Sequence, residues 1–477
     1  MALLTKSKYM VGLSCPKYLW MMFHDLDKIP EFDIATQAIM EQGNKIGKLA
    51  KKLFPAGVDL PEDDFKGNIL KTKELLKEKK TIFEAGIIAG ELYARADVLV
   101  PVGDEWDIIE VKGSTKVKPE HIHDVSFQKY VYEKFGLKIR KCFLLHINNK
   151  FIKNGDIDPN ELFTQEEITT EVEDAIVGIQ ERISDMMQII NNKEAPSVRI
   201  GNGCNLGFDC VSEECWSFLP EGNVFELTRG GKKSLELLEA EVFHIKDIPD
   251  DFKLNGKQQI QRKCANTNEV HINKEGIKNF LGNLEDPLYF MDFETFSLGI
   301  PLYDGTKPYQ QVPFQFSVHV GEEHFEYLHD SECDPREKFL LELKKVLGDK
   351  GSILVYYKSF EIGRLNELAE QFPEHKEWVE SVVERIVDLY VPFSNFDYYN
   401  PVQKGSASIK EVLPAIIGND PYKKLDINNG GLASVSYFEM IFGEVDKKKV
   451  RNDLLEYCKL DTKAMILILD ELKKLVK

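Results

Sequence analysis

Pro287-Leu-Tyr-Phe-Met-Asp-Phe-Glu-Thr-Phe296 is an apolar run with two acids in its middle, and its composition predicts a buried strand. Side chains two apart in a strand share a face, so Asp292 and Glu294 point the same way and the apolar residues around them point the other way. Two neighbouring carboxylates in such a strand repel each other and are costly to desolvate. A divalent cation held between them removes this cost. The stretch therefore indicates a metal site, with a solvated edge strand as the alternative.

The residues downstream of this stretch predict further strands and a long terminal helix. Strands are expected at 308–319, 323–328 and 352–357, with a helix at 335–347. Glu361 opens a helix directly after the strand 352–357, at the end of a strand where sites of α/β proteins usually lie. In the last helix, about 450–474, Tyr457 and Asp461 are four residues apart and share one face. Strand hairpins, helices and a terminal helix that returns an acid to the first strand predict an RNase H-like topology.

These acids and their order along the chain resemble the DEDD exonucleases. The pattern D-x-E occurs in the first strand, an acid follows in a second motif, and Y-x-x-x-D lies in the terminal helix. The tyrosine marks the tyrosine-bearing subclass of this family. The resemblance implies two Mg²⁺ or Mn²⁺ ions. It assigns them to Asp292, Glu294, Glu361 and Asp461, with Tyr457 orienting the attacking water.

The second motif departs from the family pattern. The family normally has an aspartate preceded by an asparagine, whereas this chain has Glu361, one methylene longer, with Lys358 near the asparagine's place. Asp388, on a short strand within residues 385–389, is the rival ligand.

The first half of the chain contains a second group of polar residues on a predicted hairpin. After helices at about 34–54 and 66–79, strands are expected at 82–88, 92–100 and 106–112. If the turn is symmetric about residues 103–104, Asp97 falls opposite Glu110, and Lys112 lies on the same face. Two carboxylates can hold Mg²⁺ while a lysine orients a water or stabilises charge on a phosphate. A cross-strand salt bridge is the alternative.

This hairpin and the helix after it resemble the RecB-like branch of the PD-(D/E)xK nucleases. In that family an acid, an acid-x-lysine and a Q-x-x-x-Y helix build a one- or two-metal phosphodiesterase site. The family's helical histidine near the glycine pair, here Gly43 and Gly47, is missing from this sequence. The residues that the resemblance assigns are Asp97, Glu110, Lys112, Gln128 and Tyr132, with Glu84 as an additional upstream acid.

Three cysteines occur within twelve residues of a glycine-rich segment, Gly201–Trp216. The RecB-like CRISPR adaptation nucleases and the AddB-type helicase nucleases pair one early cysteine with three late ones around a 4Fe–4S cluster. Four thiolates also suit zinc, which stays open as the alternative. The remaining cysteines, 142, 264, 333 and 458, are interpreted as buried thiols. The ligands implied for the cluster are Cys15, Cys204, Cys210 and Cys215.

The length of 477 residues predicts several domains. We expect an α/β protein with a RecB-like PD-(D/E)xK domain at 1–220, a helical connector at 221–284 and a DEDD-type domain at 285–477. The sequence contains no uninterrupted run of about 18 apolar residues, the length needed to span a membrane. Its start lacks the apolar core of a signal peptide. We therefore expect a cytoplasmic protein. The combined resemblance covers most of the chain and is to a bacterial family of predicted two-domain nucleases.

The expected function is metal-dependent exonucleolytic cleavage at the ends of single-stranded nucleic acid, DNA before RNA. The formal net charge of −18 argues against wrapping nucleic acid by bulk electrostatics, but bound metals supply positive charge locally. Two alternatives remain open. One centre alone could be active while the other half binds the strand, or the protein could be a cluster-bearing nucleic-acid-binding protein without catalysis.

Overall fold

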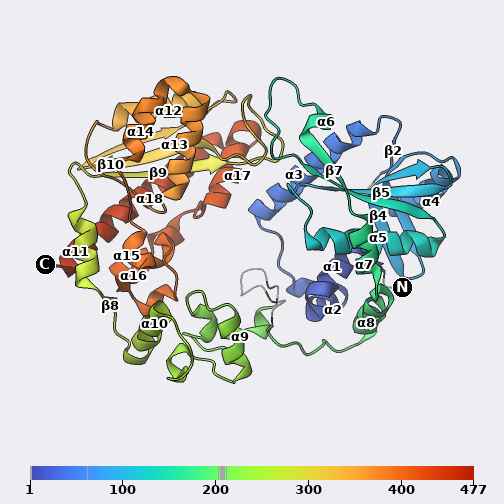
Figure 1. The fold of residues 1–477 in the computed structure, drawn as a ribbon, viewed down its shortest axis with the longest axis horizontal. Coiled ribbons are helices and arrows are strands. Elements are labelled where there is room, and N and C mark those ends of the chain that lie inside the picture. Colours follow the sequence, from blue (N-terminus) through green and yellow to red (C-terminus); the bar gives the residue numbers. More distant parts are fainter. Residues whose placement is uncertain (1–2, 62, 202–203, 205–209, 211) are drawn as a thin grey trace. The chain divides into compact units, whose positions relative to one another are not determined.

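The computed structural model describes residues 3–61, 63–201, 204, 210 and 212–477. Part of the predicted cysteine segment, residues 202–203, 205–209 and 211, lies outside the described residues. The chain forms two units, each with mixed α/β structure (Figure 1). Unit 1 contains Met1–Phe218 and Leu298–Gln310, and unit 2 contains Leu219–Ser297 and Gln311–Lys477. The segment expected as a separate connector, 221–284, lies in unit 2.

Unit 1 is built on one mixed sheet with the order β2-β3-β4-β5-β6-β7, and β1 pairs with β4. The hairpin predicted around residues 103–104 is confirmed, because Val102 pairs with Glu105 and Val98 with Ile109. Strand β6 runs parallel to β5, and β7 is antiparallel to β6. The strands are β1 Leu4–Thr5, β2 Val58–Asp59, β3 Ile82–Ala89, β4 Leu92–Val102, β5 Glu105–Lys112, β6 Ile139–Ile147 and β7 Phe163–Glu167.

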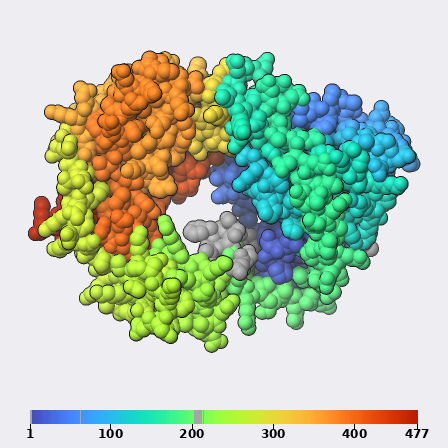
Figure 2. All heavy atoms as spheres, in the orientation of Figure 1, coloured from blue at the N-terminus to red at the C-terminus, as the bar shows by residue number. Residues whose placement is uncertain are grey.

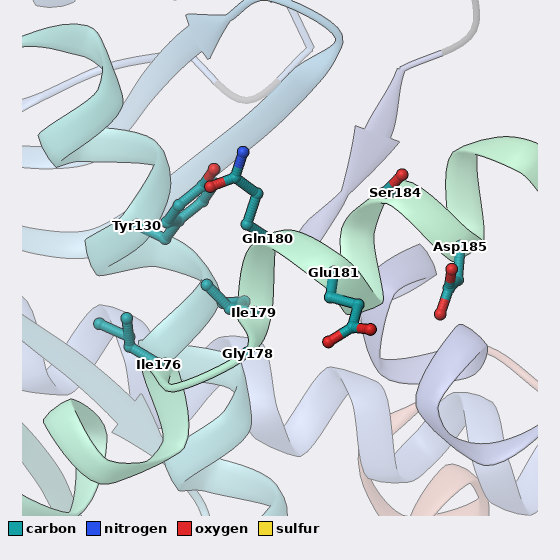
Figure 3. Close-up of a pocket in the computed structure, with 8 residues that line it drawn as sticks. All are labelled: Tyr130, Ile176, Gly178, Ile179, Gln180, Glu181, Ser184 and Asp185. Atoms are coloured by element: carbon teal, nitrogen blue, oxygen red, sulfur yellow. The ribbon is translucent and has the colours of Figure 1, made fainter.

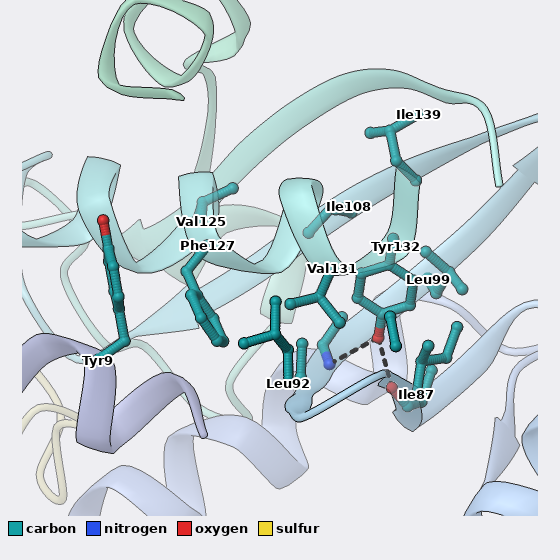
Figure 4. Close-up of a cluster of buried hydrophobic side chains, with 14 of the residues drawn as sticks. Tyr9, Ile87, Leu92, Leu99, Ile108, Val125, Phe127, Val131, Tyr132 and Ile139 are labelled. Atoms are coloured by element: carbon teal, nitrogen blue, oxygen red, sulfur yellow. Dashed lines mark hydrogen bonds between the residues drawn. The ribbon is translucent and has the colours of Figure 1, made fainter. Parts of the chain in front are cut away.

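Helices cover both faces of this sheet. Helix α5 packs against β3, β4 and β6, and α3 contacts β5. Figure 4 shows the core under α5, where Tyr9 stacks on Phe127 with ring centroids 4.7 Å apart. The helices predicted at 34–54 and 66–79 are present as α3 and α4. The helices of unit 1 are α1 Lys6–Ser14, α2 Pro16–His24, α3 Ile34–Ala50, α4 Phe65–Lys77, α5 Pro119–Phe135, α6 Pro159–Leu162, α7 Thr169–Ile176 and α8 Ile179–Asn191.

Unit 2 has a five-stranded sheet with the order β11-β10-β9-β12-β13. The first three strands form antiparallel hairpins, and β12 and β13 run parallel to β9. The predicted strand 352–357 ends early, because the backbone of Tyr357 turns to a φ of +78°. The strands are β9 Tyr289–Phe296, β10 Val312–Val320, β11 Glu323–Leu328, β12 Ile353–Val355 and β13 Ile386–Asp388.

The two faces of this sheet carry different helices. On one face α12 Arg336–Val346, α13 Ser359–Gln371 and α14 Lys376–Val383 enclose an apolar core that includes Met291 and Phe293 of β9. In Figure 2 the heavy atoms of these three helices are drawn in orange. On the opposite face, α17 Gly430–Phe442 and α18 Lys447–Leu475 pack against β9, and α18 also contacts β10. The terminal helix predicted at 450–474 is therefore present and lies on the face to which Asp292 and Glu294 point.

Shorter elements complete unit 2. The region 219–284 carries α9 Lys232–Glu239, α10 Gly256–Thr267 and α11 Lys274–Gly282, and β8 His271–Ile272 pairs with β14 Tyr398–Tyr399. The remaining helices are α15 Val391–Ser394 and α16 Ile409–Ile417. Among the described residues, no helix combines the length and the apolar composition needed to cross a bilayer.

Two candidate metal centres

The first centre, in unit 2, begins with the two acids of β9. The oxygens of Asp292 and Glu294 and the sulfur of Cys458 can all lie within 4.8 Å of one another, a spacing that would suit a shared metal ion. The Cys458 Sγ is 3.6 Å from Asp292 Oδ2. Cys458 is fully buried, as the sequence indicated, but its place beside two acids was not expected from an isolated thiol. Cys333, which was also expected to be buried, is exposed. Carboxylate oxygens bind Mg²⁺ and Mn²⁺, whereas a thiol favours softer ions.

The terminal helix α18 brings Tyr457 and Asp461 to the same place. Both are buried, and the hydroxyl of Tyr422 donates to Asp461 Oδ1 at 2.5 Å. The Lys410 ammonium lies 5.6 Å from the centre of the Tyr422 ring and 5.3 Å from that of Tyr457. Burial raises the pKa of Glu294 and of Asp461, and the positive charge of Lys410 opposes this rise. Tyr422 and Lys410 thus join a group of which the sequence predicted the acids and Tyr457.

Negative charge in this centre is not compensated by direct ion pairs with any described residue. Burial and the neighbouring carboxylates raise the pKa of Asp292 and of Glu294 well above their ordinary values. Burial also raises the pKa of Asp461 to about 6. Within the part of the chain that the structure describes, no lysine, arginine or histidine forms an ion pair with any of these three acids. A bound cation would supply the missing positive charge.

The second-motif acid, Glu361, lies in the first turn of α13 and is 2% exposed. Its Oε2 has no hydrogen-bond partner among the residues that the structure describes, and burial raises the pKa of Glu361 to about 8. The charge of Glu361 raises the pKa of Asp292 and of Glu294, which places it in the electrostatic range of the centre. A buried carboxylate oxygen without a hydrogen-bond partner is suited to bind a cation.

The carboxylate of the rival ligand, Asp388, already accepts hydrogen bonds from the backbone. Its carboxylate accepts from the N–H groups of Tyr357 at 2.9 Å, Lys358 at 3.1 Å and Tyr390 at 3.0 Å. These bonds hold the turn that leads into α13. The structure therefore favours Glu361 over Asp388 as the free ligand.

The second centre, in unit 1, lies on the β4–β5 hairpin. Val98 pairs with Ile109, so the next residues along the two strands, Asp97 and Glu110, lie opposite each other. Asp97 Oδ2 accepts from the N–H of Val111 at 2.7 Å. The Lys112 ammonium is 2.7 Å from Glu110 Oε1. The predicted grouping of acid, acid and lysine is present in the structure.

Two residues that the sequence did not single out complete this group. The Lys6 ammonium is 2.8 Å from Glu110 Oε1. Asp124 of α5 accepts from Lys112 at 2.6 Å, and its other oxygen is 3.6 Å from Lys6. Gln128 donates to Glu110 Oε2 at 2.7 Å and to Asp124 Oδ1 at 2.9 Å.

The charges of this centre are nearly balanced. Burial alone would raise the pKa of Glu110, but the ammoniums of Lys112 and Lys6 hold it well below its ordinary value. Burial, followed by the charge of Glu110, raises the pKa of Asp97 to about 7. The two centres therefore differ: lysines compensate the acids in unit 1, whereas the described residues of unit 2 form no ion pair with Asp292, Glu294 or Asp461.

Glu84 lies beside Asp97 in a distorted part of β3. Its backbone has a φ of +55°, a strained conformation for a residue with a side chain. Phe83 and Val98 belong to the core under α3, whereas Ala85 and Ala96 belong to the core under α5. The alternation of the two strands thus shifts at Glu84 and Asp97, while their register stays the same on either side.

A cavity of about 430 Å³ opens at these acids. Glu84 forms ion pairs there with Lys51 at 3.1 Å and with Arg95 at 3.3 Å. The polar and charged side chains that line the cavity are Lys6, Asn44, Lys48, Lys51, Glu84, Arg95, Asp97, Glu110 and Lys112.

Among the described residues, the Tyr132 hydroxyl bonds to the backbone beside the centre and not to the acids of the centre. Its hydroxyl donates to the carbonyl of Ala85 and accepts from the N–H of Ala96 at 3.0 Å (Figure 4). These bonds fix α5 against β3 and β4 on either side of the distortion. Of the predicted Q-x-x-x-Y pair, Gln128 contacts the acids and Tyr132 holds the strands.

Cys15 lies within electrostatic range of two other predicted cluster thiols. Burial raises the pKa of Cys15, and the neighbouring thiols of Cys210 and Cys215 raise it further. Cys15 Sγ also accepts from the N–H of Tyr18 at the start of α2. Cys204 is half-buried at a bend of the same segment. Among the described residues, these thiols form no group of three with sulfurs within 4.8 Å of one another. By chemistry alone, four thiolates suit a thiophilic metal or an Fe–S cluster.

A second hollow in unit 1, of about 660 Å³, lies between α5, α7 and α8 (Figure 3). Its lining includes Tyr130, Ile176, Gln180 and Asp185. Two acids, Glu181 and Asp185, also line it, and none of its lining residues is one of the predicted site residues.

Comparisons with known proteins add a family but no function. Residues 289–408, which begin with β9 and include Glu361 and Asp388, match a family described as a domain of unknown function, DUF2779. The chain is 27% identical over 238 residues to the uncharacterized protein UU173 of Ureaplasma parvum, covering 44% of this chain and 34% of the relative. It is 26% identical over 226 residues to the uncharacterized protein MG366 of Mycoplasma genitalium, covering 42% of this chain and 34% of the relative. The chain thus covers about a third of the length of these relatives.

Proposed function

We propose that this protein is a metal-dependent nuclease that hydrolyses phosphodiester bonds at the ends of single-stranded nucleic acid, with DNA as the first substrate to test. The observation that carries the proposal is the unit 2 centre. Asp292, Glu294 and Asp461 are brought together, and among the described residues they have no ion-pair partner and the buried Glu361 Oε2 has no hydrogen-bond partner. Such a group of acids fits divalent cations better than a structural role.

The topology of unit 2 supports this proposal. Its strand order, with three antiparallel strands followed by two parallel ones, is the order expected of an RNase H-like domain. The terminal helix returns Asp461 to the first strand, as the resemblance to DEDD exonucleases requires. In unit 1, the acids on a hairpin and the following helix with Gln128 support a PD-(D/E)xK domain.

In unit 2 the residues that would hold Mg²⁺ or Mn²⁺ are Asp292, Glu294, Glu361 and Asp461. The bound ions would activate a water and neutralise charge on the phosphate. The chain's own groups position the ligands: the Tyr422 hydroxyl fixes one oxygen of Asp461, and Tyr457 is held beside it. Lys410 adds a positive charge for a phosphate of the strand.

In unit 1 the residues that would hold a metal ion are Asp97 and Glu110, and Glu84 beside them would be an additional ligand. Lys112 can donate to a phosphate oxygen or orient a water, because it lines the cavity and is 26% exposed. The cations Lys48, Lys51 and Arg95 at the cavity are suited to the phosphates of a strand. We further propose a 4Fe–4S cluster on Cys15, Cys204, Cys210 and Cys215, with zinc as the alternative.

The test is digestion of end-labelled single-stranded DNA and RNA with Mg²⁺ or Mn²⁺. Asp292→Ala and Lys112→Ala should each remove part of the activity, and the double variant should be inactive. Glu377→Ala and Lys66→Ala are matched controls, because both side chains are exposed and lie on helices, α14 and α4, whereas Asp292 and Lys112 lie on strands. Full activity of the double variant would contradict the proposal.

One observation favours a second candidate, in which only unit 2 cleaves. Both oxygens of Glu110 already accept from side chains, Oε1 from Lys6 and Lys112 and Oε2 from Gln128. In that case unit 1 binds the strand, and Asp292→Ala alone abolishes all cleavage while strand binding persists.

A further inference from the structure

Lys6 reaches the unit 1 centre from far along the chain. Its ammonium shares Glu110 Oε1 with Lys112, at 2.8 and 2.7 Å respectively. Both ammoniums also lie beside Asp124, at 3.6 Å for Lys6 and 2.6 Å for Lys112. Lys6 is 23% exposed and lines the cavity. It is therefore part of the centre's open face.

The fold fixes Lys6 in this position by two local devices. Strand β1 pairs with the start of β4, where Leu4 lies beside Leu92 and Thr5 beside Tyr93. Leu4 is fully buried. Thr5 then caps α1 by accepting from the N–H of Lys8. Lys6 follows immediately, so neither the strand nor the helix can shift without moving its ammonium.

The formal charges show what this lysine does. In unit 1, three carboxylates (Asp97, Glu110 and Asp124) face two ammoniums, which leaves a charge of −1. Glu84 and Asp59 are balanced separately by Lys51 and Arg95. One divalent ion changes −1 to +1, which is opposite in sign to a phosphodiester, whereas two would give +3. In unit 2 the four acids sum to −4, which two divalent ions neutralise.

We propose that Lys6 occupies the place of a second cation, so that the unit 1 centre binds one divalent ion whereas the unit 2 centre binds two. Lys6 is then a charge-compensating residue that holds Glu110 and Asp124 together beside the single ion. This inference rests on the proposed metal-dependent function of unit 1.

The experiment counts bound Mn²⁺ by the loss of the free-ion signal in electron paramagnetic resonance. The full-length parent carries Asp292→Asn, Glu294→Gln and Asp461→Asn, which disable the unit 2 centre. Adding Asp97→Asn and Glu110→Gln gives the baseline. We expect one ion above baseline in the parent and two in the parent with Lys6→Met. Since a positive charge is removed next to the site, the first ion should also bind about tenfold more tightly, or by about 1.4 kcal/mol.

Two variants on the same helix serve as controls. Lys6→Arg keeps the charge and should retain one ion. Lys8→Met should also retain one, because the Lys8 ammonium lies over the Phe23 ring, 3.8 Å from its centre, and away from the acids. Thermal unfolding of each variant checks the fold.

The outcomes separate this inference from the proposed function. Two ions in the parent would overturn the role of Lys6 without any substitution at Lys6. An unchanged count in a folded Lys6→Met variant would overturn it as well. No ion above baseline in the parent would contradict the metal centre of unit 1, and with it the proposed two-centre function.

Discussion

At the scale of single residues, Asp292 should reduce stability in the absence of metal. Its neighbours are acids, and burial raises its pKa. We expect Asp292→Asn to raise the free energy of unfolding in a chelator by about 1–3 kcal/mol, because it removes an unpaired buried charge. The same change should abolish the stabilisation that Mn²⁺ gives to the wild type. Thermal unfolding with and without Mn²⁺ measures both effects, with Glu377→Gln as an exposed control. Equal stabilisation of both proteins by Mn²⁺ would argue against a ligand role.

Asp461 predicts a pH dependence of the metal-free protein. Burial raises the pKa of Asp461 from 3.8 to about 6, so the folded state binds this proton more tightly than the unfolded state. Ionisation of Asp461 therefore costs stability as the pH rises from about 4 to 6, and the cost stays constant above. We expect Asp461→Asn to be as stable as the wild type near pH 4 and more stable above pH 6. The midpoint of unfolding in a chelator, measured for both proteins across this range, checks the prediction. A difference that shrinks as the pH rises would contradict it.

At the scale of elements, Asp388 should act on α13 as a structural anchor. It accepts three backbone hydrogen bonds in the turn that precedes Glu361. Asp388→Ala leaves these N–H groups without their acceptor, so we expect a loss of about 1–3 kcal/mol in the free energy of unfolding. Asp388→Asn, which keeps an acceptor oxygen, should lose less. If Asp388 were instead a metal ligand, Asp388→Asn would keep its stability and lose Mn²⁺ binding.

Tyr132 should likewise hold α5 to the sheet of unit 1. Its hydroxyl bonds to backbone groups of β3 and β4 on either side of Glu84 and Asp97. We expect Tyr132→Phe to cost about 1–3 kcal/mol, because the N–H of Ala96 and the carbonyl of Ala85 are left unpaired in the core. Denaturant unfolding measures the loss, and a cost near zero would contradict the role.

The sequence could predict elements and faces better than long-range contacts. The alternation around Asp292 and Glu294 predicted their shared face, and the turn at 103–104 predicted the register of Asp97 and Glu110, because both depend on neighbours a few residues away. Lys6 lies 104 residues from Glu110 in sequence. Its position depends on the pairing of β1 with β4, which no local sequence pattern predicts. Asp124, four residues before Gln128 on one helix, could have been found from that spacing. The environments of Cys458 and Tyr422 depend on how α18 packs, which periodicity does not specify.

At the scale of the whole molecule, a loop that interrupts the sequence of unit 2 belongs to unit 1. Residues Leu298–Gln310 lie between β9 and β10 in sequence and are part of unit 1 in the structure. Lys153 N donates to Thr306 O at 3.0 Å, and Gly305 N donates to Lys153 O at 2.8 Å. The Tyr309 hydroxyl donates to the carbonyl of Gly113, the residue after Lys112. A substitution in this loop should therefore act on the unit 1 centre.

Tyr309→Phe tests this dependence in the full-length protein. The lost hydrogen bond should cost about 0.5–1.5 kcal/mol and loosen the backbone that carries Lys112. We expect it to lower cleavage when only unit 1 is active, in the Asp292→Ala background, and to leave cleavage unchanged when only unit 2 is active, in the Lys112→Ala background. Tyr398→Phe is the matched control, because its hydroxyl also donates to a backbone carbonyl, that of Ala415 at 3.5 Å in unit 2. An equal effect of Tyr309→Phe in both backgrounds would show that the loop acts through overall stability and not through the unit 1 centre.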